Sequence, residues 1–286
     1  MHFLNLEHAR ETVGRLIRAL TGDYCNSDQL DAAYRTGISK IRPIAPPEAG
    51  ISVSFEDGDW GRYLVAKNLF QDIFVGIEAS SEVQRLEWEN QVAAAIQHVR
   101  KVNSGLGGII DLLVTDIVVL QSERTGGGSA SHIPGLVCMS PGDDWTVFDF
   151  AESLMHEATH LNLFVADMVY GMYILPTNTL ADAQYRVLSA VKVGELRPLD
   201  KAFHSAVVAV PLMYMQHERG ESTLVDLFRK SLLECTDGLL EKREYFTEYG
   251  QMLVDELRRF ALTVDFDYVE HSISDDVYSF YKPVAA

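Results

Sequence analysis

Two histidines and a glutamate stand at a spacing that suits metal chemistry. The segment Met155–Leu161 reads Met-His-Glu-Ala-Thr-His-Leu, so His156 and His160 are four residues apart. On a helix, side chains four residues apart share one face, where two imidazoles can hold one divalent metal ion. Glu157 points about 100° away from His156. It is therefore expected to contact water or another ligand at the metal rather than to bind the metal itself.

The residues around this motif predict the helix that it needs. Apolar residues recur at helical spacing from Val147 to Val169, which is typical of a buried amphipathic helix. Two histidines and a glutamate are costly to bury in such a helix unless a partner satisfies them. A chance match to a five-residue pattern is the alternative, and the apolar setting favours metal binding over it.

A third protein ligand is needed, and several residues are candidates for it. His204 is preferred, because it lies early in an apolar stretch, residues 199–216, that predicts a helix. The metal site is therefore expected between the motif helix and this following helix. The other candidates are Asp167 on the motif helix, Glu195 in a loop and His132 in a serine-rich loop. The remaining histidines are expected at surface or terminal positions without a role: His2, His8, His98, His217 and His271.

Composition restricts the partners and the compartment. A net charge of −17 argues against nucleic-acid binding, which needs clustered Lys and Arg. The longest apolar stretch, residues 206–215, is too short to cross a membrane, and the N-terminus has no signal-peptide pattern. Cys25, Cys138 and Cys235 fit neither a disulfide framework nor a zinc finger. We therefore expect a cytoplasmic protein without a membrane partner.

Hydrophobic periodicity and turn residues predict a mainly α-helical fold with a small β-sheet, of the α+β class, in one domain over residues 1–286. Strands are expected at 52–55, 112–120 and 135–140. Residues 125–131 are expected to be a flexible polar loop, either at the rim of the site or a plain linker. Helices are expected at 6–20, 29–40, 61–73, 81–101, 147–169, 180–191, 199–216, 222–234 and 238–262. The segment 263–286 has no assignment.

Three segments together resemble a known family. They are Pro134–Val137, Ala151–Leu161 and Leu196–Ala206, the last of which contains Arg-Pro-Leu followed by His204. The combination resembles the HExxH-motif proteins of peptide natural-product clusters, which are regarded as iron(II)- and 2-oxoglutarate-dependent peptide β-hydroxylases. The likeness covers residues 129–215, the expected core of the metal site. The family's usual Trp-Arg cluster before the Arg-Pro element is absent, and residues 180–193 stand in its place.

The resemblance implies an oxygenase of natural-product biosynthesis that hydroxylates an unactivated C–H bond, expected at the β-carbon. Its substrate would be an amino-acid residue in a peptide, a carrier-bound amino acid or a free one. His156, His160 and His204 would hold Fe(II) and leave positions for 2-oxoglutarate and O₂. Arg197 would bind the distal carboxylate of 2-oxoglutarate, with a surface salt bridge as the alternative. Glu157 would orient a ligand or a substrate amine.

A zinc-dependent metallopeptidase or amidohydrolase is the alternative hypothesis for the same motif. In such an enzyme, Glu157 would be the general base that takes a proton from water at the zinc. One class of zinc proteases extends the motif to His-x-x-Gly-x-x-His, but the downstream positions here hold Leu163 and Ala166. A binding protein that keeps the motif without catalysis is a third hypothesis.

Overall fold

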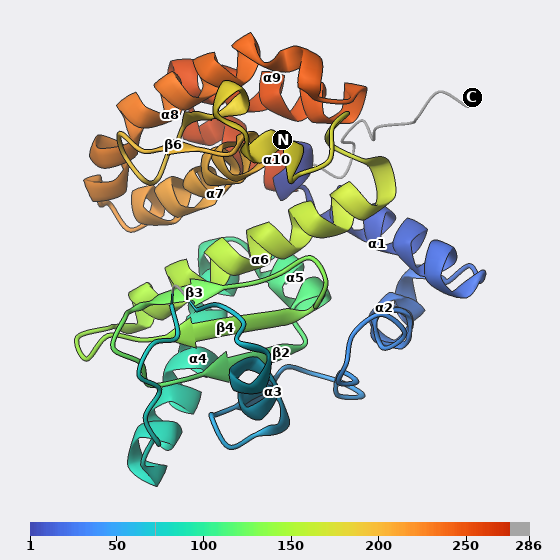
Figure 1. Cartoon of the computed structure of the whole chain (residues 1–286), viewed down its shortest axis with the longest axis vertical. Helices are drawn as coiled ribbons and strands as arrows, with labels where there is room; N and C mark the ends of the chain where they lie inside the picture. Colours follow the sequence, from blue (N-terminus) through green and yellow to red (C-terminus); the bar gives the residue numbers. More distant parts are fainter. Residues whose placement is uncertain (72, 275–286) are drawn as a thin grey trace. The chain divides into compact units, whose positions relative to one another are not determined.

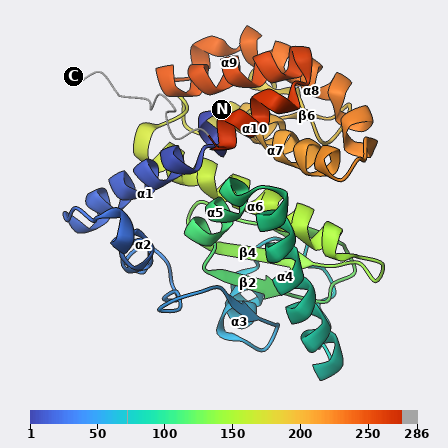
Figure 2. The ribbon, with the colours of Figure 1, turned by 180° about the vertical axis from the view of Figure 1, so that it is seen from behind.

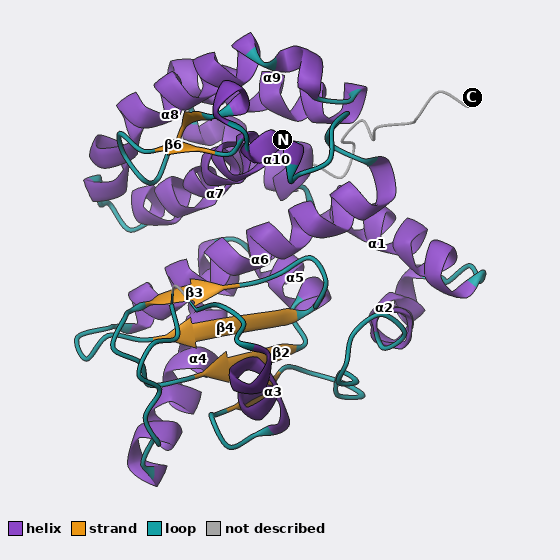
Figure 3. Ribbon diagram, viewed as in Figure 1, coloured by secondary structure: helices purple, strands orange, loops and turns teal. Residues whose placement is uncertain are grey.

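The computed structural model describes residues 1–71 and 73–274 and is mainly helical, with small β-sheets (Figures 1 and 3). The prediction of a mainly helical α+β fold is therefore confirmed. Contacts divide the chain into two compact units, Arg10–Val165 and a unit made of Met1–Ala9 with Ala166–Ala286. A division into compact units does not test the single-domain assignment, which stays a prediction.

A four-stranded sheet forms the centre of the unit Arg10–Val165, with strand order β1-β2-β4-β3. The strands are β1 (Ser52–Ser54), β2 (Asp116–Val119), β3 (Gly126–Gly128) and β4 (Leu136–Ser140). β1, β2 and β4 run parallel, whereas β3 is an antiparallel edge strand on β4. Every residue of β2 and β4 is buried, which is why both read as nearly continuous apolar runs.

Helices cover both faces of this sheet. The helices of this unit are α2 (Leu30–Ile38), α3 (Asp59–Lys67), α4 (Glu82–Val102), α5 (Ser104–Leu113), most of α1 (Leu6–Thr21) and most of α6 (Val147–Tyr170). Figure 2 shows α4 and α5 over one face of the sheet. On the other face, Trp60 and Leu64 of α3 pack with Val118, Leu136 and Cys138 of the strands. Ser81 starts α4 with a reciprocal capping box to Gln84.

The second unit is almost entirely helical. Its elements are α7 (Leu199–Glu218), α8 (Thr223–Glu241), α9 (Glu248–Thr263), α10 (Phe266–Ser274) and the antiparallel pair β5 (Val187–Leu188) and β6 (Leu196–Arg197). α7 is buried along nearly its whole length. No helix among residues 1–71 and 73–274 has the length and apolarity that a bilayer crossing requires.

Most of the predicted helices and strands are present. The observed helices α1, α2, α4, α6 and α7 and the strands β1 and β4 match the expected ranges closely. In contrast, α3 ends at Lys67 instead of residue 73, because Asn68 takes a left-handed backbone conformation, with φ of 54°. The strand expected at 112–120 is limited to β2, since Leu112 and Leu113 belong to α5.

Three other predicted elements are wrong. Residues 125–131 contain the strand β3 and are not simply a loop, and residues 180–191 form short 3₁₀ turns and β5 instead of a helix. Gly238 does not separate two helices but lies inside α8, where a Cβ atom would stand 2.5 Å from Val187. The glycine is therefore a packing contact rather than a helix end. Within the unassigned segment 263–286, α10 ends at Ser274, and residues 275–286 lie outside the described residues.

His2 and His8, which were expected at surface or terminal positions, lie near the N-terminus but are both buried. His2 Nδ1 lies 2.6 Å from a carboxylate oxygen of Glu256, and His8 Nε2 lies 2.9 Å from the hydroxyl of Tyr249. Both partners are more than 240 residues away in sequence. These histidines are therefore part of the second unit's core.

Candidate metal site

His156 and His160 converge on one face of α6. Their Nε2 atoms lie 3.1 Å apart, and their ring centroids are 4.8 Å apart. Two ligands at about 2.1 Å from one metal ion and at right angles to each other would be roughly 3.0 Å apart. The two imidazole nitrogens therefore have the spacing of neighbouring ligands on a single ion, and the pair fits a metal.

Glu157 is directed toward the sheet. Only 4% of the residue is exposed, and Ser129 Oγ donates a hydrogen bond of 2.7 Å to Glu157 Oε2. Its other oxygen, Oε1, lies 3.9 Å from His156 Nε2. Burial raises the pKa of Glu157 to about 7, although the hydrogen bond from Ser129 opposes the shift. The carboxyl group can therefore bind or release a proton near neutral pH, right beside the histidine pair.

The edge strand β3 lines this site and consists of glycine alone. A Cβ atom at Gly127 would lie 2.9 Å from Ser153 Oγ and 3.0 Å from Glu157 Oε1. On the opposite face, a Cβ atom at Gly128 would lie 2.8 Å from the ring of Phe70. The strand thus passes between α6 and the segment around Phe70 with no room for side chains. The absence of a side chain at position 127 therefore leaves the space that the Glu157 carboxylate occupies.

The structure brings together three of the predicted site residues, His156, Glu157 and His160, within one unit. His204, buried on α7, and Arg197, half-buried on β6, belong to the other unit. Their roles as third ligand and as 2-oxoglutarate-binding residue therefore stay predictions. Within residues 1–71 and 73–274, no group of three His, Cys, Asp or Glu side chains is gathered as a complete ligand set.

The other candidates for the third ligand have different surroundings. Asp167 accepts a hydrogen bond of 2.7 Å from the backbone N–H of Met172, which lies just beyond the last residue of α6, Tyr170. Glu195 and His132 are exposed. None of the three is gathered with the histidine pair as a ligand set among the described residues.

Residues that the sequence did not single out complete the site. Ser129 holds Glu157, and Gly127 gives the carboxylate its space. The run of three glycines was the available signal, because glycine inside a strand often marks a close approach of backbone to another group. No protein-family model and no curated protein sequence matches the chain. The function therefore has to be inferred from these residues.

Proposed function

We propose that the chain is an oxygenase that uses Fe(II) and 2-oxoglutarate to hydroxylate an unactivated C–H bond, at the β-carbon of an amino-acid residue, in natural-product biosynthesis. The supporting observation is the 3.1 Å approach of the Nε2 atoms of His156 and His160. The bound metal and keto acid would supply the activation of O₂. His204 completes the ligand set in this proposal, and Arg197 binds the distal carboxylate of 2-oxoglutarate.

An all-histidine ligand set suits an anionic co-substrate. Imidazole ligands are neutral, so a divalent ion held by His156, His160 and His204 keeps its full positive charge. That charge attracts the two carboxylates of 2-oxoglutarate more strongly than a site with a carboxylate ligand would.

The edge strand β3 favours a peptide among the possible substrates. β3 pairs with β4 on one side and is the last strand in the sheet order among the described residues. The other edge of such a strand can pair with the backbone of an extended peptide. Gly127 of β3 lies against Glu157, so a peptide paired there would pass beside the histidines. A carrier-bound or free amino acid would not use this edge.

One observation favours a second candidate, the zinc-dependent metallopeptidase or amidohydrolase. Glu157 Oε1 is 3.9 Å from His156 Nε2, and the pKa of Glu157 is raised to about 7. A carboxylate with this pKa is well matched to general-base chemistry at neutral pH. In the hydrolase, Glu157 would take the proton from the attacking water. In the oxygenase, it would hold Ser129 and β3 in place.

The variant Glu157→Gln separates these two functions. Glutamine retains the shape and can still accept the hydrogen bond from Ser129, but it cannot take up a proton. The oxygenase is expected to keep its metal and much of its conversion of 2-oxoglutarate to succinate. A hydrolase would lose about 10² to 10⁴-fold in peptide cleavage. For the parent protein and the variant, the experiment measures succinate formation with Fe(II), peptide cleavage with Zn(II) and metal content.

Glu89→Gln is the control, since Glu89 is an exposed carboxylate on α4, away from the histidine pair. It is expected to change neither activity. Loss of cleavage of a peptide in Glu157→Gln alone, without any succinate from the parent protein, would contradict the oxygenase.

We further propose that the protein acts in the cytoplasm. Cys25, Cys138 and Cys235 are all free thiols, which suits a reducing compartment. The net charge of −17 favours small-molecule or peptide partners over nucleic acid.

A further inference from the structure

A cavity of about 620 Å³ lies in the unit Arg10–Val165, where α2, α4 and α5 meet the residues just before β1. It reaches the sheet through Gly50 and Ile51, beside the edge strand β1. Glu157 lies at the opposite edge strand, β3. The cavity is therefore separate from the candidate metal site. Its volume is typical of sites that hold small organic molecules.

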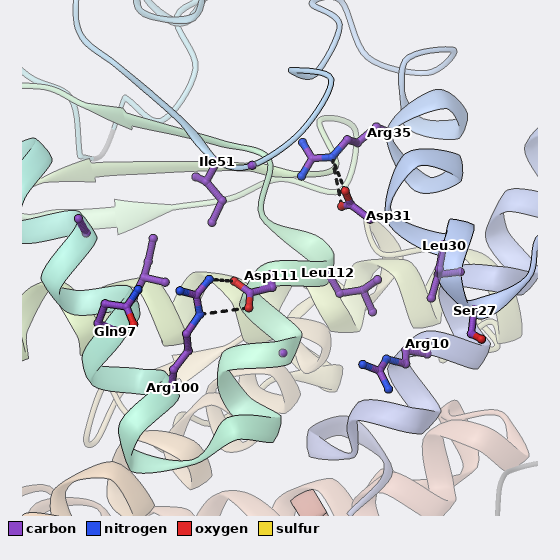
Figure 4. Close-up of a pocket in the computed structure, with 14 residues that line it drawn as sticks. Arg10, Ser27, Leu30, Asp31, Arg35, Ile51, Gln97, Arg100, Asp111 and Leu112 are labelled. Carbon is purple, nitrogen blue, oxygen red and sulfur yellow. Dashed lines mark hydrogen bonds and ion pairs between the residues drawn. The ribbon is translucent and has the colours of Figure 1, made fainter.

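Three arginines line this cavity, Arg10, Arg35 and Arg100, and an aspartate holds each of the last two (Figure 4). Arg35 Nε donates to both carboxylate oxygens of Asp31 at 3.1 Å, and its Nη1 donates to the Pro47 carbonyl at 3.3 Å. Arg100 donates from Nε and Nη2 to the two oxygens of Asp111, at 3.2 and 2.6 Å. These contacts fix both guanidinium groups before any ligand binds.

Each guanidinium group keeps one nitrogen for a ligand. Arg35 Nη2 and Arg100 Nη1 donate to no group within the described part of the chain, and neither does the side-chain amide of Gln97 on the same wall. The side chain of Arg35 is 6% exposed and that of Arg100 is 40% exposed, and neither open nitrogen is sealed off from the cavity. An oxyanion would satisfy these donors with charge-assisted hydrogen bonds.

The rest of the wall combines Arg10 and Ser27 with apolar side chains. The apolar side chains that line the cavity are Leu30, Ile51, Ala93, Ile96 and Leu112. A few fixed polar groups on an apolar wall are the usual composition of a small-molecule site, in which the polar groups orient the ligand. The ligand that fits therefore has an apolar body as well as a negative group.

A glycine on α5 allows this arrangement. A Cβ atom at Gly107 would lie 2.5 Å from Cγ of Arg100. Because Gly107 has no Cβ atom, α5 packs closely against α4, and Asp111 reaches Arg100. Asn103 is the single residue between the two helices, and its Oδ1 accepts hydrogen bonds from the backbone N–H groups of Gly105 and Leu106. Asn103 therefore caps the N-terminus of α5.

We propose that this cavity binds a small organic oxyanion, a carboxylate or phosphate group on an apolar body, through the open guanidinium nitrogens of Arg35 and Arg100. The site does not depend on the proposed oxygenase activity, because it contains neither His156 nor His160. In a chain with a net charge of −17, long-range attraction does not bring an anion here. The local donors must provide the affinity.

The test follows the side-chain Nε–Hε resonances of the arginines by NMR in the full chain. The probes are hydrocinnamate, phenyl phosphate, the neutral hydrocinnamamide and inorganic phosphate. Both organic anions are expected to shift the resonances of Arg35 and Arg100, and hydrocinnamamide is not. In Arg100→Gln, the affinity is expected to fall roughly tenfold or more, because a charge-assisted hydrogen bond is lost. Arg62→Gln is the control, since Arg62 forms an exposed ion pair with Asp59 away from the cavity.

The outcomes distinguish the possible ligands. Tighter binding of hydrocinnamate than of phenyl phosphate identifies a carboxylic acid as the ligand, and the reverse identifies a phosphate ester. Equal binding of hydrocinnamamide, or an unchanged affinity in Arg100→Gln, would overturn the proposal. So would the absence of any shift at millimolar concentrations of both organic anions. Equal affinity for inorganic phosphate would contradict the apolar part of the site.

Discussion

His160→Ala is expected to weaken the binding of a divalent metal ion by at least about 100-fold, because it removes one of two convergent imidazoles. His156 alone cannot replace the pair, whose Nε2 atoms lie 3.1 Å apart in the parent protein. The measurement is titration with Zn(II) and Fe(II) in competition with a chelator, together with metal content after purification. Circular dichroism checks that the variant is folded.

His271→Ala is the matched control for this variant. His271 is an exposed histidine on α10, and its loss is expected to leave metal affinity unchanged. His204→Ala examines the third ligand separately, and a comparable loss of affinity is expected. Full metal occupancy in His160→Ala would show that the motif does not hold the ion. Full occupancy in His204→Ala would refute only the third ligand.

Arg42→Ala is expected to lower the free energy of unfolding by about 3 to 5 kcal/mol, since it leaves a buried aspartate without its cation. Arg42 Nη2 lies 2.5 Å from Asp116 Oδ2, and the two side chains are 0% and 7% exposed. Trp60 Nε1 donates to the other oxygen of Asp116 at 3.1 Å. Thr115 Oγ1 donates a second hydrogen bond, of 2.7 Å, to Asp116 Oδ2, but two neutral donors do not compensate a buried carboxylate for the lost charge. Urea denaturation measures the change.

The exposed pair of Arg62 and Asp59 provides the comparison. Their side chains are 65% and 76% exposed, so Arg62→Ala is expected to change the free energy of unfolding by less than about 1 kcal/mol. If Arg42→Ala lost no more stability than Arg62→Ala, the buried ion pair of Arg42 and Asp116 would not stabilise the fold as proposed.

The helix of the site could be predicted because its signals are local. The spacing of apolar residues over 147–169 predicted the bounds of α6 to within one residue. The four-residue spacing of His156 and His160 predicted that their side chains lie together on one face. The partners of Glu157 could not be found in this way. Ser129 is 28 residues away in sequence, and glycine has a low preference for strands, so β3 had the composition of a loop.

Errors elsewhere have the same origin in tertiary contacts. Gly238 suggested a helix end, but α8 continues through it because Val187 occupies the space of the missing side chain. His2 and His8 suggested an exposed terminus, but Glu256 and Tyr249 bind them in the core of the second unit. Each of these positions is determined by a residue far away in sequence, which no local pattern shows.

The proposed chemistry is tested most directly by anaerobic reconstitution of the protein with Fe(II), followed by addition of 2-oxoglutarate and visible spectroscopy. An oxygenase site is expected to give a weak metal-to-ligand charge-transfer band as the keto acid chelates the iron, and His160→Ala is expected to lack it. No band in the parent protein, with zinc tightly retained through purification, would contradict the oxygenase and favour the hydrolase.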